Sequence, residues 1–89
     1  MKHRYLEVTY RKGKPLAAYL YLPRAPSAKA VRTEDAGNGM RVDYDTSGNP
    51  IGIEITAPTL VTLDAIGAVL ERAGQLRLLP DEWAPLHAA

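Results

Sequence analysis

The chain has 89 residues, no cysteine, 46% hydrophobic and 24% charged residues, and a formal net charge of +1. Its length predicts a single domain, 1–89, and its composition is typical of a folded globular protein. The absence of cysteine excludes disulfides and thiolate chemistry, and the near-zero charge creates no field that attracts nucleic acid. With no membrane-spanning run of ~20 apolar residues and no signal peptide, we expect a cytoplasmic protein.

The first predicted element is a β-hairpin from Leu6 to Leu22, in which apolar and other residues alternate. A loop over 12–14 gives one register that matches both faces of the hairpin. On one face the pairs are apolar: Leu6 with Leu20, Val8 with Ala18 and Tyr10 with Leu16. On the other face the pairs are Tyr5 with Tyr21 and Glu7 with Tyr19.

Two prolines in 23–28 predict a connection, and Lys29–Glu34 is predicted as a third strand that bridges two hairpins in the sequence. Asp35–Gly39 is then expected to turn the chain. The second hairpin runs over Met40–Ile55, around a loop at 46–49. Its register pairs Met40 with Ile55, Val42 with Ile53 and Tyr44 with Ile51, and places Arg41 opposite Glu54 on the outer face.

The turn of the second hairpin, "DYDTSGNPIGIE", has the ligand spacing of a calcium-binding EF-hand loop. An EF-hand also needs an entering helix, but "GNG" and a strand-like alternation precede this loop. Pro50 further lacks the backbone N–H that a paired EF-hand loop would use. We therefore predict a simple turn, and a weak surface cation site on Asp43, Asp45 and Glu54 is the alternative.

The pattern becomes helical after residue 61, where Thr62 is a good N-cap and Gly74 a good stop for a helix over Leu63–Ala73. Its apolar stripe should cover one face of the sheet. The apolar tail, 76–89, should make a short helical turn from about Pro80 and fold Trp83 onto the core or a partner. The predicted fold is α+β: an antiparallel sheet of four or five strands, over about 4–56, packed on one C-terminal helix.

The run "MRVDYDTSGNPIGIEI" resembles the signature of a small bacterial and archaeal family, domain of unknown function 2283. That signature is a strand ending Asp-x-Asp, a turn with glycine and a strand of the form V/I-G-I-E-I-L. The matching positions are Asp43, Asp45, Gly48, Gly52, Ile53, Glu54 and Ile55, with a looser match at Ala18–Tyr21. The resemblance spans roughly residues 4 to 56, and Pro15–Ala17 and the C-terminal helix and tail depart from it. It implies a partner-binding protein, sometimes encoded in gene pairs of the toxin and antitoxin type, and implies no activity, cofactor or catalytic residue.

The sequence indicates no reaction. Asp43 and Glu54 share the predicted outer face, but Arg41 opposite Glu54 favours a cross-strand ion pair over a catalytic carboxylate pair. No serine or threonine has a base nearby to activate it. We expect no catalytic residue and no cofactor, and a small metal-dependent enzyme built on Asp43, Asp45 and Glu54 is the third interpretation of function.

A basic end of the first hairpin suggests the second interpretation, nucleic-acid binding by phosphate contacts and stacking on Tyr5 and Tyr10. Lysines on an edge hairpin also discourage aggregation, and we prefer that interpretation. The basic residues are Lys2, Arg4, Arg11, Lys12 and Lys14.

Three tyrosines lie on the predicted sheet face opposite the helix, where one helix leaves the sheet uncovered. Either the tail with Trp83 wraps over this face or a second chain does, and we predict a homodimer. The predicted interface comprises Tyr5, Tyr19, Tyr21 and Trp83. The first interpretation of function is therefore a non-enzymatic interaction module, regulatory or antitoxin-like, with a protein partner that is encoded nearby.

Overall fold

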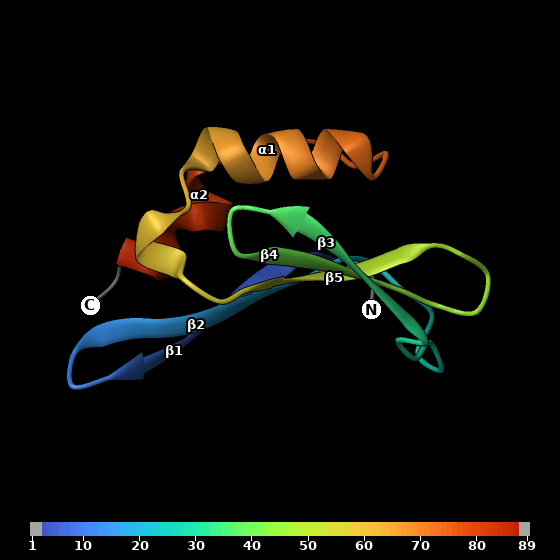
Figure 1. Cartoon of the computed structure of the whole chain (residues 1–89), viewed down its shortest axis with the longest axis horizontal. Coiled ribbons are helices and arrows are strands. Elements are labelled where there is room, and N and C mark those ends of the chain that lie inside the picture. The colour runs from blue at the N-terminus through green and yellow to red at the C-terminus, as the bar shows by residue number, and fades with distance from the viewer. Residues whose placement is uncertain (1–2, 88–89) are drawn as a thin grey trace.

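A computed structural model describes residues 3–87 of the chain. Five strands form one antiparallel sheet in the order β1-β2-β5-β4-β3, and α1 (Leu63–Arg72) lies across one of its faces (Figure 1). The prediction of an antiparallel sheet packed on a C-terminal helix is therefore confirmed. The strands are β1 (Tyr5–Arg11), β2 (Lys14–Tyr21), β3 (Arg32–Gly37), β4 (Met40–Tyr44) and β5 (Pro50–Ile55).

The register of the first hairpin is confirmed from residue 5 to residue 8 and is wrong near the turn. Lys12 and Gly13 alone make the turn, with φ values of 53° and 76°, because two consecutive positive φ angles match the twist of paired strands. This shorter turn pairs Tyr10 with Pro15, and a bulge at Leu16 restores the predicted register. Leu16 is consequently 53% exposed instead of facing the core.

The second hairpin shows the same combination of a correct register and an unpredicted bulge. Met40 pairs with Ile55, Arg41 with Glu54 and Val42 with Ile53, as predicted, but Tyr44 pairs with Pro50 and not with Ile51. The residues before the turn form strand β4 and not the entering helix that an EF-hand needs, so the predicted hairpin turn is confirmed. Within that turn, Asp45 Oδ1 accepts hydrogen bonds from the backbone N–H groups of Ser47 and Asn49, both at 2.9 Å.

The third strand lies three residues further along the chain than predicted. It spans Arg32–Gly37 instead of Lys29–Glu34, and the turn after it contains only Asn38 and Gly39, again with positive φ. An Asn-Gly pair closes a two-residue hairpin turn, which lets β3 pair with β4 as far as Gly37. β3 therefore forms an outer edge of the sheet, while β2 pairs directly with β5.

The core lies between α1 and the sheet face that carries the predicted apolar pairs. Thr62 caps α1 as predicted, since its Oγ1 accepts a hydrogen bond from the N–H of Ala65 at 3.0 Å. The helix ends at Arg72, one residue before the predicted end, and a short 3-10 helix, η1 (Pro58–Leu60), precedes it. Residues with no exposed surface are Leu20, Leu22, Met40, Ile53, Ile55, Ile66 and Leu70.

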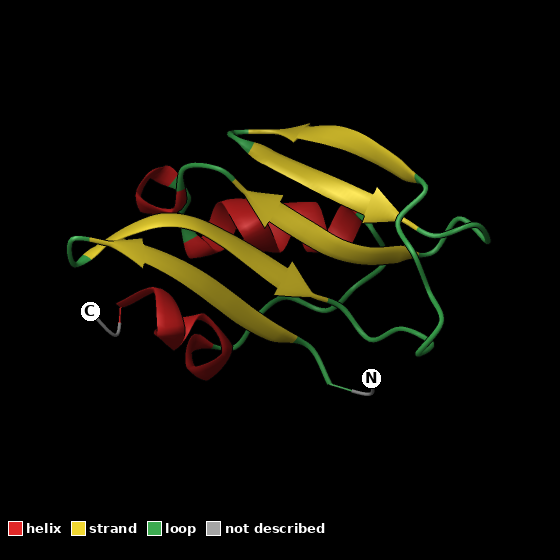
Figure 2. Cartoon of the chain, turned by 90° about the horizontal axis from the view of Figure 1, so that it is seen from below, coloured by secondary structure: helices red, strands yellow, loops and turns green. Residues whose placement is uncertain are grey.

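The tail packs on the helix side of the sheet, beside β1 (Figures 1 and 2). It forms α2 (Pro80–Trp83), which begins where predicted, and then η2 (Ala84–His87). Trp83 is only 5% exposed and belongs to the core cluster. The hydroxyl of Tyr10 on β1 donates a hydrogen bond to the Pro85 carbonyl, which fixes η2 against the strand.

Arg4 is the main polar link between the start of the sheet and the tail. Its guanidinium pairs with the Glu82 carboxylate, with 2.7 Å between Nε and Oε2, and also donates to the carbonyls of Leu76 and Arg77. The two side chains are 13% and 24% exposed, so water screens this ion pair only in part. Arg4 therefore holds the segment that carries Trp83 onto the core.

This link predicts a specific pH dependence of stability. Hydrogen bonds from Arg4 and from the Leu79 amide hold the pKa of Glu82 below its ordinary value of 4.5, and burial opposes them. Because the folded-state pKa is lowered, the stabilisation is present above pH 4.5 and is lost as the pH falls through the lowered pKa.

The free energy of unfolding of Glu82→Gln should therefore lie below that of the wild type at neutral pH, and the difference should shrink below pH 4.5. Urea unfolding at a series of pH values, followed by the fluorescence of Trp83, measures this difference. A difference that stays constant from pH 7 into the acid range would show that the ion pair does not link the tail to the sheet.

No helix within residues 3–87 is long and apolar enough to cross a membrane.

Candidate interaction surface

The sheet face opposite α1 is open. Figure 2 views the molecule from this side, with α1 behind the strands and no element in front of them. Tyr5 and Tyr21 are cross-strand partners on this face, and their rings stack with centroids 4.6 Å apart. The ring of Tyr19 lies 4.7 Å from that of Tyr21 at an angle of 56°. We call this surface, centred on Tyr5, Tyr19 and Tyr21, the tyrosine face.

Gly52 on β5 allows Tyr19 to lie flat across the sheet. A Cβ atom at residue 52 would sit 2.0 Å from the Tyr19 hydroxyl oxygen, so any side chain there would displace the ring. The hydroxyl reaches over β5 and donates to Asp43 Oδ2 on β4 at 2.6 Å, and Thr33 on β3 donates to Asp43 Oδ1 at 2.6 Å. Burial, followed by the hydrogen bond to Asp43 and its negative charge, raises the pKa of Tyr19 to about 12.

Charged side chains of both signs surround the tyrosines. Glu7 and Glu54 are the neighbours of Tyr19 on the two adjacent strands, because Tyr19 pairs with Glu7 on one side and with Glu54 on the other. The row continues through Arg41 to Asp35, while Arg24 lies over the Tyr21 ring, 5.4 Å from its centroid.

Arg11 and Lys14, which pair with each other, lie on the same face at the β1–β2 turn, two and four residues along β1 from Thr9 and Glu7. The basic residues Arg11, Lys14, Arg24 and Arg41 thus balance the acidic residues Glu7, Asp35, Asp43 and Glu54, and the formal charge of the face is zero. Glu7 also accepts a hydrogen bond from the Tyr21 hydroxyl at 3.2 Å.

The structure separates the residues of the predicted cation site. Asp43 accepts hydrogen bonds on both carboxylate oxygens, and Asp45 caps its own turn. Glu54 lies beside Tyr19, in the row next to that of Asp43. Within residues 3–87, no three acidic or histidine side chains are grouped so that they could hold a metal ion.

The predicted basic end of the first hairpin is divided in the same way. Arg4 is bound to Glu82 and to tail carbonyls at one end of β1. Arg11, Lys12 and Lys14 are exposed at the opposite end, around the β1–β2 turn. Lys2 lies outside the described residues. The described part of the hairpin therefore offers phosphate contacts only at this turn, where Arg11 and Lys14 lie on the same side of the sheet as the tyrosines.

Trp83 does not lie with the tyrosines, and this corrects its place in the predicted interface. It is buried in the core cluster, in the part of the tail that packs beside β1, on the opposite side of the sheet. The tail therefore covers the apolar face and leaves the tyrosine face uncovered. Tyr5, at 48% exposure, is the most accessible of the three tyrosines.

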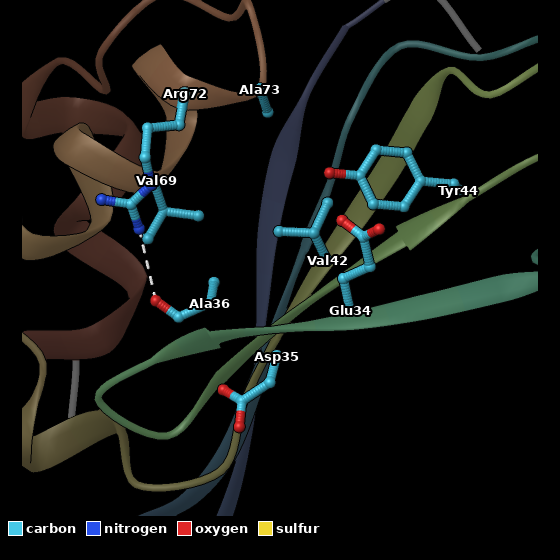
Figure 3. A pocket seen from close by; sticks show the side chains of 8 residues that line it. All are labelled: Glu34, Asp35, Ala36, Val42, Tyr44, Val69, Arg72 and Ala73. Atoms are coloured by element: carbon cyan, nitrogen blue, oxygen red, sulfur yellow. Dashed lines mark hydrogen bonds between the residues drawn. The ribbon is translucent and has the colours of Figure 1, made fainter.

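A cleft of about 230 Å³ opens on the other side of the sheet, between β3, β4 and the end of α1 (Figure 3). Val42 and Val69 point towards one another across it, and Arg72 donates a hydrogen bond to the Ala36 carbonyl at 3.3 Å. Its lining residues are Glu34, Asp35, Ala36, Val42, Tyr44, Val69, Arg72 and Ala73.

The five-stranded antiparallel sheet, one covering helix and an open aromatic face define a small α+β protein. Residues 17–57 match the family described as protein of unknown function (DUF2283). The match runs from β2 through β5 and confirms the family resemblance of the second hairpin, whereas α1 and the tail lie beyond it. Comparisons with curated proteins and with solved structures gave no match.

Proposed function

We propose that this protein is a non-enzymatic interaction module that binds another polypeptide chain through the tyrosine face. One observation carries the proposal: three neighbouring tyrosines lie on a sheet face that neither α1 nor the tail covers. Tyrosine is enriched at protein interfaces because its ring buries a large apolar area while its hydroxyl keeps a hydrogen-bond partner. The regulatory or antitoxin-like role implied by the family resemblance would use such a surface.

A second copy of the chain is one partner that this proposal includes. The tail packs on the other side of the sheet, so no helix within residues 3–87 covers the tyrosines, and only the Arg24 side chain lies over the Tyr21 ring. Two copies that stack their sheets face to face would bury these rings in a common interface. The homodimer predicted from the sequence is therefore part of the proposal.

The homodimer predicts that Tyr21→Glu converts a dimer into a monomer. Tyr21 contacts both other tyrosines, so the substitution places a charge in the middle of the stacked rings, where an interface would have to desolvate it. Light scattering after size-exclusion chromatography measures the mass of both proteins. Leu79→Glu is the matched control, because Leu79 is 65% exposed on the tail, on the other side of the sheet, and should leave the mass unchanged.

A wild-type protein that is monomeric at concentrations up to about 100 µM would remove the second copy as a significant partner. A dimer with a dissociation constant well below this concentration would be detected. A dimer that dissociates with Leu79→Glu and not with Tyr21→Glu would place the interface on the tail instead.

A further inference from the structure

We infer that two copies of this chain pair through the outer edge of β3 and so continue one antiparallel sheet across both molecules. The inference goes beyond the proposed function, because it uses an edge of the sheet and not the tyrosine face. It rests on an uncovered edge, on a bulge that limits this edge and on charges that favour a single register.

The outer edge of β3 is uncovered in the described part of the chain. β1 and β3 are the two edge strands, and the tail contacts β1, whereas no element within residues 3–87 lies beyond β3 (Figure 2). An edge strand presents backbone N–H and C=O groups that can pair with a strand of another chain. Such pairing supplies main-chain hydrogen bonds without a change of fold.

A bulge limits the length of this edge. The register of β3 against β4 shifts between Asp35 and Gly37, which leaves Ala36 as the extra residue. The carbonyl of Ala36 accepts a hydrogen bond from Arg72 at 3.3 Å. Because a bulge bends the strand and interrupts regular pairing, the regular edge consists of residues 32–35.

Symmetry restricts the ways in which two such edges can pair. Identical antiparallel strands are related by a two-fold axis perpendicular to the sheet, and this axis keeps every side chain on its own face. Arg32 and Glu34 lie on the side of α1. Thr33 and Asp35 lie on the side of the tyrosines. Each residue therefore faces its own copy or a residue an even number of positions away.

The charges of the edge favour one of these registers. Pairing centred on Arg32, Glu34 or Asp35 would place that residue opposite its own copy, and like charges directly opposite are destabilising. Pairing centred on Thr33 instead places Arg32 of each copy opposite Glu34 of the other. Charged residues on an edge usually prevent pairing, but here their order prevents only the wrong registers.

The side chains at this seam are free to rearrange into the contact. Arg32 and Glu34 form an ion pair within the chain, and their side chains are 52% and 51% exposed. A guanidinium group has five N–H donors, so Arg32 can bond both its own Glu34 and Glu34 of the second copy. The four groups then alternate in sign. Because exposed ion pairs are weak, they set the register more than the affinity.

Edge pairing has a consequence for the tyrosine face. The two-fold axis places both tyrosine faces on one side of the continuous sheet and both copies of α1 on the other. The edge is short compared with stable interfaces, so we expect a dissociation constant of about 1 mM. Two copies that are held by one partner reach effective concentrations in this range, and the seam would then add to the affinity for that partner.

Amide NMR of isotope-labelled Tyr21→Glu tests the pairing, because this substitution removes association through the tyrosine face. A dilution series from about 1 mM to about 20 µM covers the expected dissociation constant. The expected result is a concentration-dependent shift of the β3 amides, including those of Thr33 and Glu34. In this background, Arg32→Glu or Glu34→Arg should remove the shift, because each places like charges opposite one another.

Mixing the two charge variants separates an interface from a structural role. Labelled Arg32→Glu mixed with unlabelled Glu34→Arg, both in the Tyr21→Glu background, should regain the β3 shifts, because each new charge then faces an opposite one. The matched control is unlabelled Asp81→Arg in the same background. It makes the same charge change at an exposed residue of α2, leaves like charges at the seam and should not restore the shifts.

The absence of β3 shifts up to about 1 mM in Tyr21→Glu would overturn the inference. Shifts that persist in either charge variant alone, or equal recovery with both unlabelled chains, would overturn it as well. None of these results bears on the tyrosine face, which the light-scattering comparison of the wild type with Tyr21→Glu tests separately.

Discussion

Replacing Gly52 with alanine is expected to lower the free energy of unfolding by about 2–4 kcal/mol, the sum of overpacking and a lost hydrogen bond to a charged group. The added Cβ would sit 2.0 Å from the Tyr19 hydroxyl oxygen and 2.3 Å from two ring carbons. The ring must move, because the alternative is a shift of the β5 backbone between two paired strands. Displacement of Tyr19 also leaves Asp43 without one of its two hydrogen bonds.

Urea unfolding measures this loss, and alkaline titration of tyrosine absorbance measures its cause. The Tyr19 pKa, about 12 in the folded wild type, should fall in Gly52→Ala as the phenol moves away from Asp43 and into water. A double-mutant cycle supplies the control: in a Tyr19→Ala background, Gly52→Ala should cost much less, because the ring that the Cβ meets is gone. Equal costs in both backgrounds would show that Gly52 is needed for another reason.

Replacing Trp83 with alanine is expected to cost about 3–5 kcal/mol, the usual range for removal of a buried aromatic side chain. Trp83 is 5% exposed and packs in the core cluster together with Leu78 and Leu86 of the same tail. Its loss should open a cavity between the tail and the sheet, and the Arg4–Glu82 pair would then become more exposed to water.

Unfolding followed by circular dichroism measures this effect, since the variant has no other tryptophan. Leu79→Ala is the matched control, because Leu79 is in the same tail but 65% exposed, and it should change stability by less than about 0.5 kcal/mol. A cost for Trp83→Ala as small as that of the control would mean that the tail is not part of the core.

The sequence predicted the hairpins well because their alternation has a period of two and any slip would move apolar residues to the wrong face. Leu6, Val8, Val42 and Met40 accordingly have the partners that the pattern indicated. The bulges next to both turns were missed. A bulge arises where the length of the turn does not fit the register of the two strands. The alternation of apolar residues does not show how many residues the turn contains.

The missed features of the surface have a common physical origin in long-range contacts. Gly52 was recognised as part of a family signature, but its reason, the ring of Tyr19 lying over it, depends on β2 pairing with β5. Arg4 was grouped with basic hairpin residues, yet its partners lie more than 70 residues away in the tail. Trp83 was assigned to the core or a partner without a choice between them, and the position of the tail beside β1 decides for the core.

The tyrosine face as a binding surface is the central claim, and site-specific photo-crosslinking in the organism that encodes the protein tests it most directly. A photoreactive phenylalanine derivative replaces Tyr5, which is 48% exposed on this face, or Leu79, which is 65% exposed on the tail. We predict one reproducible crosslinked product from position 5, at twice the mass of the chain for a second copy or at another mass for a different protein partner, and no such product from position 79. No product from position 5, or the same product from both positions, would contradict the claim.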